Sequence, residues 1–367
     1  MSERVCRWGI LSTAVIARKN WQAIKLAGNA TVAAVASRSL EKSQQFIAEC
    51  QSHVPFATPP QAMGSYEELL ASPDVDAVYI PLPTGIRKDW VVRAANAGKH
   101  VLVEKPVGVT ASDVSEMLEA CRKNNVQFMD GVMFMHSKRL DKLRAVLDDG
   151  VSVGRIRRIA TQFSFCAGDE FMSDNIRVKN DLEPLGCLGD LGWYNLRFTL
   201  WTMKYEMPTR VSARLLKSVP APAGGVRVPL EFSAELFFPG EVTSSFYCSF
   251  VTENQQWANI SGTKGFVRLD DFVLPYYGSE AGFEVVNATF EARCCDMDMH
   301  RRARREYVSE YSNSGVNSQE TNLLRNFSSI VLSGQLDPTW GEIALKTQRV
   351  MDACVESANR DGAYVTP

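Results

Sequence analysis

The feature that most constrains the fold is an alternation, from residue 7 to about residue 131, between short apolar runs and amphipathic stretches. The apolar runs are rich in strand-forming residues and occupy residues 8–11, 31–36, 77–80, 100–103 and 127–129. Between the last two runs, Thr110 and Asp113 have the spacing of a helix-capping box, and apolar residues then recur with a helical period until Asn124. Strands that alternate with helices form a parallel sheet, so we expect a doubly wound domain over residues 1–131.

The pattern changes after residue 131. Longer extended runs follow at residues 157–165, 209–218, 230–238, 242–251, 257–260 and 265–269, and a turn-rich stretch at 219–225 interrupts them. These runs predict an α+β domain with a large, mostly antiparallel open sheet over residues 132–340. The last residues, 341–367, return to a helical pattern that includes Ile343, Val350 and Met351, and we expect this helix and tail to pack near the domain junction. The expected fold class is thus α/β, with an N-terminal Rossmann domain before the antiparallel-sheet domain.

Composition narrows the classes of function. The 367 residues suit two domains, and 40 Lys and Arg nearly balance 42 Asp and Glu. The one basic run, at 301–305, reads as a solvated edge or loop, so we expect no nucleic-acid partner. No apolar stretch is long enough to span a membrane, so we expect no membrane partner. Residues 1–8 lack a signal-peptide pattern, so we expect a cytoplasmic protein. Nine scattered cysteines predict reduced thiols, and four histidines without ligand spacing predict no bound metal.

The first strand leads into a degenerate form of the glycine-rich dinucleotide fingerprint. Gly9 is followed by Ser12 and Ala14 at positions where the fingerprint has glycine. A small residue at Ala14 lets a pyrophosphate approach the N–H groups at the start of a helix, although a generic strand-to-helix turn would look similar. The second strand ends in Ser37 and Arg38 without a carboxylate, which favours NADP over NAD; alternatively, Arg38 only stacks on the adenine.

A further motif, Glu104-Lys105-Pro106, follows the strand at residues 100–103 and is preceded by Gly98-Lys99-His100. Together with the features above, it resembles the Gfo/Idh/MocA oxidoreductase family. Asp190 and Tyr194, four residues apart, resemble the subgroup of glucose-fructose oxidoreductase, dimeric dihydrodiol dehydrogenase and NADP-linked D-xylose 1-dehydrogenase. Two positions depart from the family pattern: Arg87 stands where relatives often have histidine, and the segment around His136 differs from theirs.

The resemblance implies a set of site residues. For the cofactor it implies Gly9, Ser12, Thr13, Ala14, Ile16, Ser37, Arg38, Pro81, Leu82, Pro83, Thr84, Arg87, Glu104 and Lys105. For the substrate it implies His136, Asn175, Arg177, Asp190 and Tyr194, of which Asp190 and Tyr194 are also catalytic together with Lys105. His136 could instead be a histidine satisfied within a pocket wall.

The chemistry of Lys105, Tyr194 and Asp190 supports this assignment. Oxidation of a hydroxyl requires a group that takes its proton, and a free tyrosine, with a pKa near 10, is mostly in the wrong form at neutral pH. An ammonium group within about 4–6 Å favours the phenolate, so Lys105 is expected to activate Tyr194. Asp190 shares a helix face with Tyr194 and could bind a substrate hydroxyl or orient Lys105. The alternatives are that Lys105 is a surface lysine, Tyr194 a core aromatic residue and Asp190 a helix N-cap.

The sequence therefore predicts an NADP-dependent oxidoreductase that acts on a ring hydroxyl of a sugar. The first expectation is an aldose 1-dehydrogenase that produces a lactone. The alternatives are a trans-dihydrodiol dehydrogenase or an inositol or polyol dehydrogenase and, from another class, a non-catalytic NADP-binding sensor or regulatory protein.

In the runs at 230–238 and 242–251 neither set of alternating residues is plainly charged, so we expect a homodimer through this sheet, unless a helix or the segment 287–311 covers it.

Overall fold

The structure is a computed structural model that describes residues 4–220 and 227–367. The turn-rich stretch at 219–225 therefore lies largely outside the described residues. By contacts, the chain forms two compact units. The first comprises Met1–His136, Asp181–Pro184 and Asn313–Arg349, and the second Ser137–Asn180, Leu185–Ser312 and Val350–Pro367. The ranges expected from the sequence place residues 313–340 in the second domain, whereas their contacts group them with the first unit.

The first unit contains a six-stranded sheet in the order β3-β2-β1-β4-β5-β6, and every pairing in it is parallel. The strands are β1 (Cys6–Leu11), β2 (Ala30–Ala36), β3 (Gln61–Met63), β4 (Ala77–Ile80), β5 (His100–Val103) and β6 (Phe128–Asp130). The expected Rossmann domain is confirmed. Because the strand order reverses between β1 and β4, the fold places its ligand site at the carboxyl ends of these strands.

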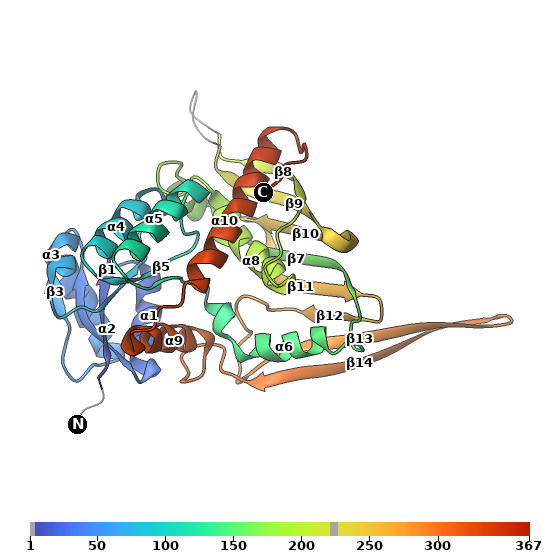
Figure 1. Cartoon of the computed structure of the whole chain (residues 1–367), viewed down its shortest axis with the longest axis horizontal. Helices are drawn as coiled ribbons and strands as arrows, with labels where there is room; N and C mark the ends of the chain where they lie inside the picture. Colours follow the sequence, from blue (N-terminus) through green and yellow to red (C-terminus); the bar gives the residue numbers. More distant parts are fainter. Residues whose placement is uncertain (1–3, 221–226) are drawn as a thin grey trace. The chain divides into compact units, whose positions relative to one another are not determined.

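Helices pack against this sheet (Figure 1). They are α1 (Val15–Ala27), α2 (Leu40–His53), α3 (Tyr66–Ala71), α4 (Thr84–Asn96), α5 (Ala111–Lys123) and, from the end of the chain, α9 (Gln319–Ser333); a 3₁₀ turn, η1 (Met133–His136), follows β6. The capping box of Thr110 and Asp113 is present at the start of α5, and Asn124 caps its end. Helix α9 completes the core, since the Trp8 indole donates a hydrogen bond of 3.1 Å to Ser328 Oγ and lies 5.0 Å from the ring of Phe327.

The second unit contains an eight-stranded sheet in the order β14-β13-β12-β11-β7-β10-β9-β8. Its strands are β7 (Ile156–Cys166), β8 (Arg210–Ser218), β9 (Pro229–Phe238), β10 (Val242–Ser249), β11 (Val251–Gly262), β12 (Phe266–Leu269), β13 (Glu280–Arg293) and β14 (Asp296–Ser309). All pairings are antiparallel except that of β10 with β7. The expected, mostly antiparallel sheet is therefore confirmed.

The helical segments of the second unit are α6 (Lys138–Asp148), α7 (Asp169–Asp174), η2 (Ile176–Val178), η3 (Leu188–Gly192), α8 (Trp193–Thr202) and η4 (Pro239–Glu241). The last helix, α10 (Thr339–Asn359), begins among residues of the first unit and ends among those of the second.

One face of the large sheet is buried and the other is open. Along β9, buried residues such as Phe232 and Leu236 alternate with half-exposed residues such as Glu235. The buried face packs against α8, where Thr199 Oγ1 and Ser244 Oγ lie 3.1 Å apart and Asn195 donates to Thr161 Oγ1. We call the opposite side of this sheet the open face.

Two strands at one end of the sheet correct a sequence-based expectation. The segment 287–311, considered as a possible cover for the sheet, instead forms much of the β13–β14 hairpin, and the basic run at 301–305 lies on the edge strand β14. Figure 1 shows this hairpin extending as a ribbon well beyond the other strands of its sheet.

Candidate functional site

The turn between β1 and α1 forms a cradle for an anion. Ser12 has φ 125°, in the region that favours glycine, and its Oγ accepts a hydrogen bond of 3.3 Å from the Ala14 N–H. Ala14, the N-cap of α1, provides no side-chain cap, and the apolar Val15 behind it is 82% exposed. Uncapped N–H groups beside an exposed apolar side chain fit the pyrophosphate and ribose of a dinucleotide, so these residues suit the expected cofactor.

Ser37 and Arg38 follow β2 at the same edge of the sheet. Ser37 is buried, and its hydroxyl donates to the Ser39 carbonyl (2.9 Å) and accepts from the Ser39 N–H (3.1 Å). Arg38 is exposed and makes no hydrogen bond or ion pair with any residue in the described ranges 4–220 and 227–367. The Ser37 hydroxyl therefore shapes the turn, while the Arg38 guanidinium is the group available to a ligand.

The loop after β4 carries Pro81, Leu82 and Pro83 and leads into Thr84, the first residue of α4. It is held by a carboxylate that the sequence did not reveal. Glu183 accepts hydrogen bonds from the Thr84 N–H (3.0 Å) and from Thr84 Oγ1 (2.5 Å) at the start of α4. A Cβ atom at Gly85 would lie 2.2 Å from the Asp181 carbonyl oxygen, so this close approach requires glycine. The sequence signal was indirect: Pro83, the N-cap of α4, has no side chain able to cap a helix.

Arg87 is buried and binds main-chain carbonyls. Its guanidinium donates to the Leu82 and Glu104 carbonyls, each at 2.9 Å, and to the Pro106 carbonyl. It thereby ties the loop after β4 to the loop after β5. The expected contact of Arg87 with the cofactor stays a prediction, whereas its role in positioning these loops follows from the hydrogen bonds.

Lys105 follows β5 and is half-buried. Its N–H donates to Glu104 Oε2 at 3.3 Å, and Glu104 Oε1 accepts from the Tyr79 hydroxyl at 2.6 Å. Burial, together with the neighbouring Glu104 carboxylate, raises the pKa of Tyr79 well above its usual value, so Tyr79 stays a neutral donor. Glu104 thus anchors the turn that presents Lys105, and its predicted cofactor contact remains untested.

His136 lies in the core of the first unit. Its ring stacks on Trp340 at a centroid distance of 4.6 Å, and its Nδ1 lies 3.0 Å from Asn326 Nδ2. His136 is thus a buried histidine whose Nδ1 is engaged by Asn326 within the first unit. The expected contact of His136 with substrate stays a prediction.

In the second unit, three of the predicted substrate residues come together. The Asp190 carboxylate and the Arg177 Nε form an ion pair of 2.8 Å, with Asp190 the more buried partner. Asn175 Oδ1 accepts a hydrogen bond of 3.0 Å from the Arg177 N–H and so shapes the turn that presents Arg177. This pair offers both carboxylate acceptors and guanidinium donors to a polyhydroxylated ligand.

Asp190 and Tyr194 lie on one continuous helical segment, but its first turn is a π-helix rather than an α-helix. Single π-turns occur frequently at functional sites. Tyr194 is buried and packs edge-to-face on Phe163, with ring centroids 5.6 Å apart. A Cβ atom at Gly192 would lie 2.9 Å from Leu188 Cδ1, so glycine permits the tight packing of this turn.

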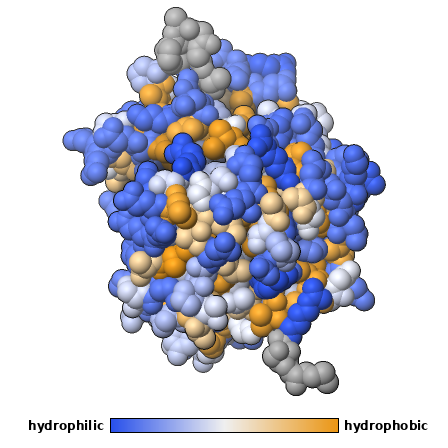
Figure 2. Space-filling view, turned by 90° about the vertical axis from the view of Figure 1, so that its left-hand side faces the viewer, coloured by the Kyte–Doolittle hydropathy of each residue, from blue (hydrophilic) through white to orange (hydrophobic). Residues whose placement is uncertain are grey.

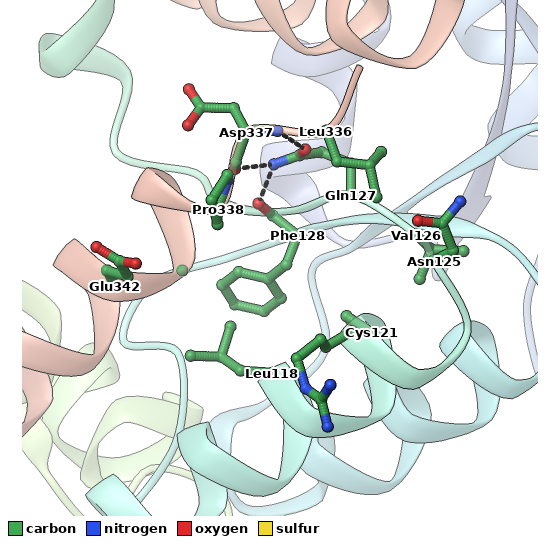
Figure 3. A pocket seen from close by; sticks show the side chains of 12 residues that line it. Leu118, Cys121, Asn125, Val126, Gln127, Phe128, Leu336, Asp337, Pro338 and Glu342 are labelled. Carbon is green, nitrogen blue, oxygen red and sulfur yellow. Dashed lines mark hydrogen bonds between the residues drawn. The ribbon is translucent and has the colours of Figure 1, made fainter. Parts of the chain in front are cut away.

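The first unit also has a cavity of about 320 Å³ between α5 and residues 336–342 (Figure 3). Its floor is apolar, with Leu118, Val126 and Phe128, and the Gln127 amide on its wall is bound to the Phe128 and Asp337 carbonyls. The loop that precedes β6 lies at the amino edge of the parallel sheet. This cavity is therefore separate from the cradle at the carboxyl edge.

Comparison with models of protein families shows the family to which the chain belongs. Residues 6–132 match the model described as an oxidoreductase family with an NAD-binding Rossmann fold, and residues 140–268 match the Gfo/Idh/MocA C-terminal domain. The chain belongs to the Gfo/Idh/MocA oxidoreductase family. Like other members of this family, it is an oxidoreductase with an NAD-binding domain.

Individual proteins show the likeness along the chain. Human trans-1,2-dihydrobenzene-1,2-diol dehydrogenase is 32% identical over 72% of this chain and 74% of its own length. The aldose-aldose oxidoreductase of Caulobacter crescentus, solved with glycerol, is 25% identical, covers 99% of this chain and 100% of its own, and has a TM-score of 0.77. KijD10, a 3-ketoreductase of Actinomadura kijaniata solved with NADP and TDP-benzene, is 24% identical over 96% of this chain and 98% of its own, with a TM-score of 0.80.

Within residues 4–220 and 227–367, no group of three or more His, Cys, Asp or Glu side chains is placed to hold a metal ion. Every helix in these ranges is too short or too polar to span a bilayer. Figure 2 shows hydrophilic and hydrophobic residues interspersed over the surface that it displays.

Proposed function

We propose that the protein is an NADP-dependent oxidoreductase that transfers hydride between the nicotinamide and a ring hydroxyl of a sugar or cyclic diol. The observation that carries this proposal is the position of Lys105, which follows β5 at the same carboxyl edge as the uncapped start of α1. A bound nicotinamide supplies the hydride acceptor, so the chain itself has to bind the substrate and handle the hydroxyl proton.

In this proposal Tyr194 takes the proton of the reacting hydroxyl. The Lys105 ammonium favours the phenolate form that does so, since an opposite charge stabilises an ionised group. The ion pair of Asp190 with Arg177 binds neighbouring hydroxyls of the substrate, the carboxylate as acceptor and the guanidinium as donor. Arg87 and Glu104 act as positioning residues, because they hold the loop that carries Lys105.

Two substrate classes fit this chemistry. Our first candidate is the anomeric hydroxyl of an aldose, oxidised to a lactone, which suits a site rich in hydrogen-bonding groups. The second candidate is a trans-dihydrodiol, because several relatives at 30–32% identity over 72% of the chain are trans-1,2-dihydrobenzene-1,2-diol dehydrogenases. Inositols and other polyols belong to the same class. A panel of pentoses, hexoses, inositols and aromatic diols, followed by NADPH absorbance, separates these substrates; cofactor binding without turnover on any of them would instead indicate a sensor.

Substitution of the proposed proton-transfer pair tests the mechanism. Lys105→Met and Tyr194→Phe should each lower kcat by about 10²–10⁴ while NADP affinity changes by no more than a few-fold, because a proton-transfer group is lost and the α1 cradle is not. If the two residues act as one unit, the double variant should lose little more than either single variant. Losses that add in free energy would show independent roles, and near-normal turnover of Tyr194→Phe would exclude Tyr194 as the proton acceptor.

All nine cysteines are free thiols, six of them buried. We propose a cytoplasmic location, which this retention of thiols supports. We also propose a homodimer that forms through the open face of the eight-stranded sheet.

A further inference from the structure

The turn at the tip of the β13–β14 hairpin consists of two consecutive cysteines. Arg293 pairs with Asp296 across the strands, so Cys294 and Cys295 connect them at the end of the ribbon that Figure 1 shows. Both are exposed free thiols, whereas six of the other seven cysteines are buried. Cysteine is among the residue types most often buried, so packing does not explain two neighbouring exposed thiols.

The backbone of this turn is strained at its first position. Cys294 has φ 54°, in the left-handed region, where two-residue hairpin turns normally have glycine or asparagine. A Cβ atom makes this conformation costly, so the turn itself would form more readily with glycine. Residues other than glycine that are held in this region cluster at functional sites. The conformation of Cys294 therefore indicates a role for its side chain.

The two thiols have the separation of sulfur ligands on one metal ion. Cys294 Sγ and Cys295 Sγ lie 3.8 Å apart. With metal–thiolate bonds of about 2.3 Å, two sulfurs at this separation make an angle of about 110° at the metal, as in tetrahedral or nearly trigonal coordination. Both thiols can therefore bind one ion with little change in the turn.

Met297 is placed to supply a third sulfur. It follows Cys295 by two residues, so a rise of about 3.4 Å per residue puts their Cα atoms about 7 Å apart. Its side chain is 70% exposed, and its cross-strand partner Ala292 is small, which leaves room for the flexible thioether to bend toward the turn. Met299 is equally exposed on the same face, but at about 14 Å from Cys295 it is too far away to share the ion.

The oxygen and nitrogen donors of β14 lie on its other face. Asp296, Asp298 and His300 alternate with the two methionines along the strand, so their side chains point to the opposite side of the ribbon. In the described ranges, the two thiols belong to no group of three or more His, Cys, Asp or Glu that could hold a metal. Structural zinc sites need four thiolate, imidazole or carboxylate ligands, whereas thiolates with a thioether suit Cu(I). The sulfur donors therefore favour a soft monovalent ion.

We propose that Cys294, Cys295 and Met297 bind one soft monovalent metal ion of the Cu(I) class. The two thiol protons leave to solvent as the two thiolates and the thioether bind the ion. Two thiolates and one monovalent cation leave a single negative charge, which water solvates at this exposed tip. The ion keeps its oxidation state, so the site is independent of the proposed hydride transfer. The expectation of no bound metal was based on histidine spacing, and this site contains no histidine.

Matched variants at the ribbon tip test the proposal. Cu(I) is supplied to the whole chain without oxygen, in competition with bicinchoninate, whose Cu(I) complex absorbs visible light. The wild type should bind one ion per chain, and Cys294→Ser with Cys295→Ser should weaken its affinity by about a hundredfold or more, because both thiolates are lost. Met297→Leu should weaken it by about tenfold, whereas Met299→Leu, the same change two residues along the same face, should leave it within about twofold.

Further measurements separate this site from other sources of affinity. Cys166→Ser removes the other exposed cysteine and should leave Cu(I) affinity unchanged. Excess Zn(II) should not displace the bound Cu(I), and X-ray absorption at the copper edge should show sulfur neighbours without nitrogen. The melting temperature without metal should be the same in all variants, because the changed side chains are exposed.

Several results would overturn the proposal. They are a wild type that leaves Cu(I) with bicinchoninate, a double cysteine variant with wild-type affinity, and a Cys166→Ser variant that loses as much affinity as the double variant. Equal affinities of Met297→Leu and Met299→Leu would overturn the assignment of Met297. NADP-dependent turnover should be unchanged in the ribbon variants, so failure of the metal site and failure of the proposed enzyme activity are distinguishable.

Discussion

At the scale of single residues, Ser37 and Arg38 differ in role, although the sequence suggested that both contact the cofactor. A hydroxyl beside a guanidinium at the end of β2 suggested two donors for a 2′-phosphate. The Ser37 hydroxyl is instead satisfied by the main chain of Ser39, so we expect the turn to depend on Ser37 and any discrimination between cofactors to depend on Arg38. The sequence placed both residues directly after the second strand, where the structure has them, but it could not show which way a small hydroxyl turns.

Cofactor preference tests this separation. Arg38→Ala should weaken NADP binding by roughly one to two decades, as expected for the loss of charge-assisted hydrogen bonds of about 1.5–3 kcal/mol, and should leave NAD binding nearly unchanged. Replacing Ser37 by Asp in addition should invert the ratio of kcat/KM for the two cofactors. Arg122→Ala, on the exposed side of α5, is the control for a lost surface arginine. A wild type that already prefers NAD contradicts the assignment.

Arg87 and Glu183 show where residue-level prediction ends. The sequence placed Arg87 near the cofactor, but its burial against three carbonyls depends on loops that meet only in the folded chain. Glu183 lies about 100 positions from the Thr84 that it caps, a separation that no local pattern spans. In contrast, Thr110 and Asp113 were predictable because a capping box is contained within four residues.

At the scale of elements, the sequence predicted strands well where alternation or apolar runs were bounded by turn residues. It missed β3, which has three residues, and the β13–β14 hairpin. The turn of that hairpin consists of Cys294 and Cys295, and Cys294 has φ 54° where hairpins normally have glycine or asparagine. Without such a residue, and with charges on both strands, the segment has no turn signal and reads as a loop.

The contact between β5 and the loop before β6 should make stability depend on pH. The His100 Nδ1 accepts a hydrogen bond of 2.9 Å from the Gln127 N–H, and burial lowers the pKa of His100 below its usual value. Below about pH 6.5, the His100 ring binds a proton more readily in the unfolded chain than in the folded chain. The contribution of neutral His100 to the free energy of unfolding is therefore present above that pH and is lost as the pH falls. For one proton, the slope cannot exceed about 1.4 kcal/mol per pH unit.

Urea unfolding between pH 7.5 and 5.5 measures this effect. His100→Asn, which keeps an acceptor near the Gln127 N–H but does not titrate, should flatten the dependence of the unfolding free energy on pH. His53→Gln, an exposed site on α2, is the control and should retain the wild-type slope. Identical slopes in all three proteins would show that His100 does not couple folding to pH.

At the scale of the whole molecule, the open face is the surface through which we expect two copies to associate. The sequence could not decide which alternate set on β10 faces outward. Ser244, Phe246 and Cys248 are buried, whereas Thr243, Ser245 and Tyr247 are half-exposed. The open face therefore carries the second set, and this assignment makes the proposed dimer testable at its centre.

Thr243→Lys with Ser245→Lys should dissociate the dimer, because two new charges would have to be desolvated at the centre of the interface. Light scattering at micromolar concentration should then give a mass near the 40.8 kDa of one chain. Ser52→Lys with Ser115→Lys, at exposed helix positions of the first unit, should leave the dimer intact. Dissociation by both variants, or by neither, would exclude the open face as the interface.

The hydrogen bond between Trp8 and Ser328 has a consequence for synthesis of the chain in the cell. The two residues are 320 positions apart, so α9 cannot pack on the sheet at β1 until nearly all of the protein has been translated. At about 5–20 residues per second, this wait lasts roughly 15–60 s, during which an apolar surface that includes Trp8 lacks its final cover on the ribosome. Nascent chains of this protein should therefore depend on chaperones for most of their elongation, although the Rossmann strands are made first.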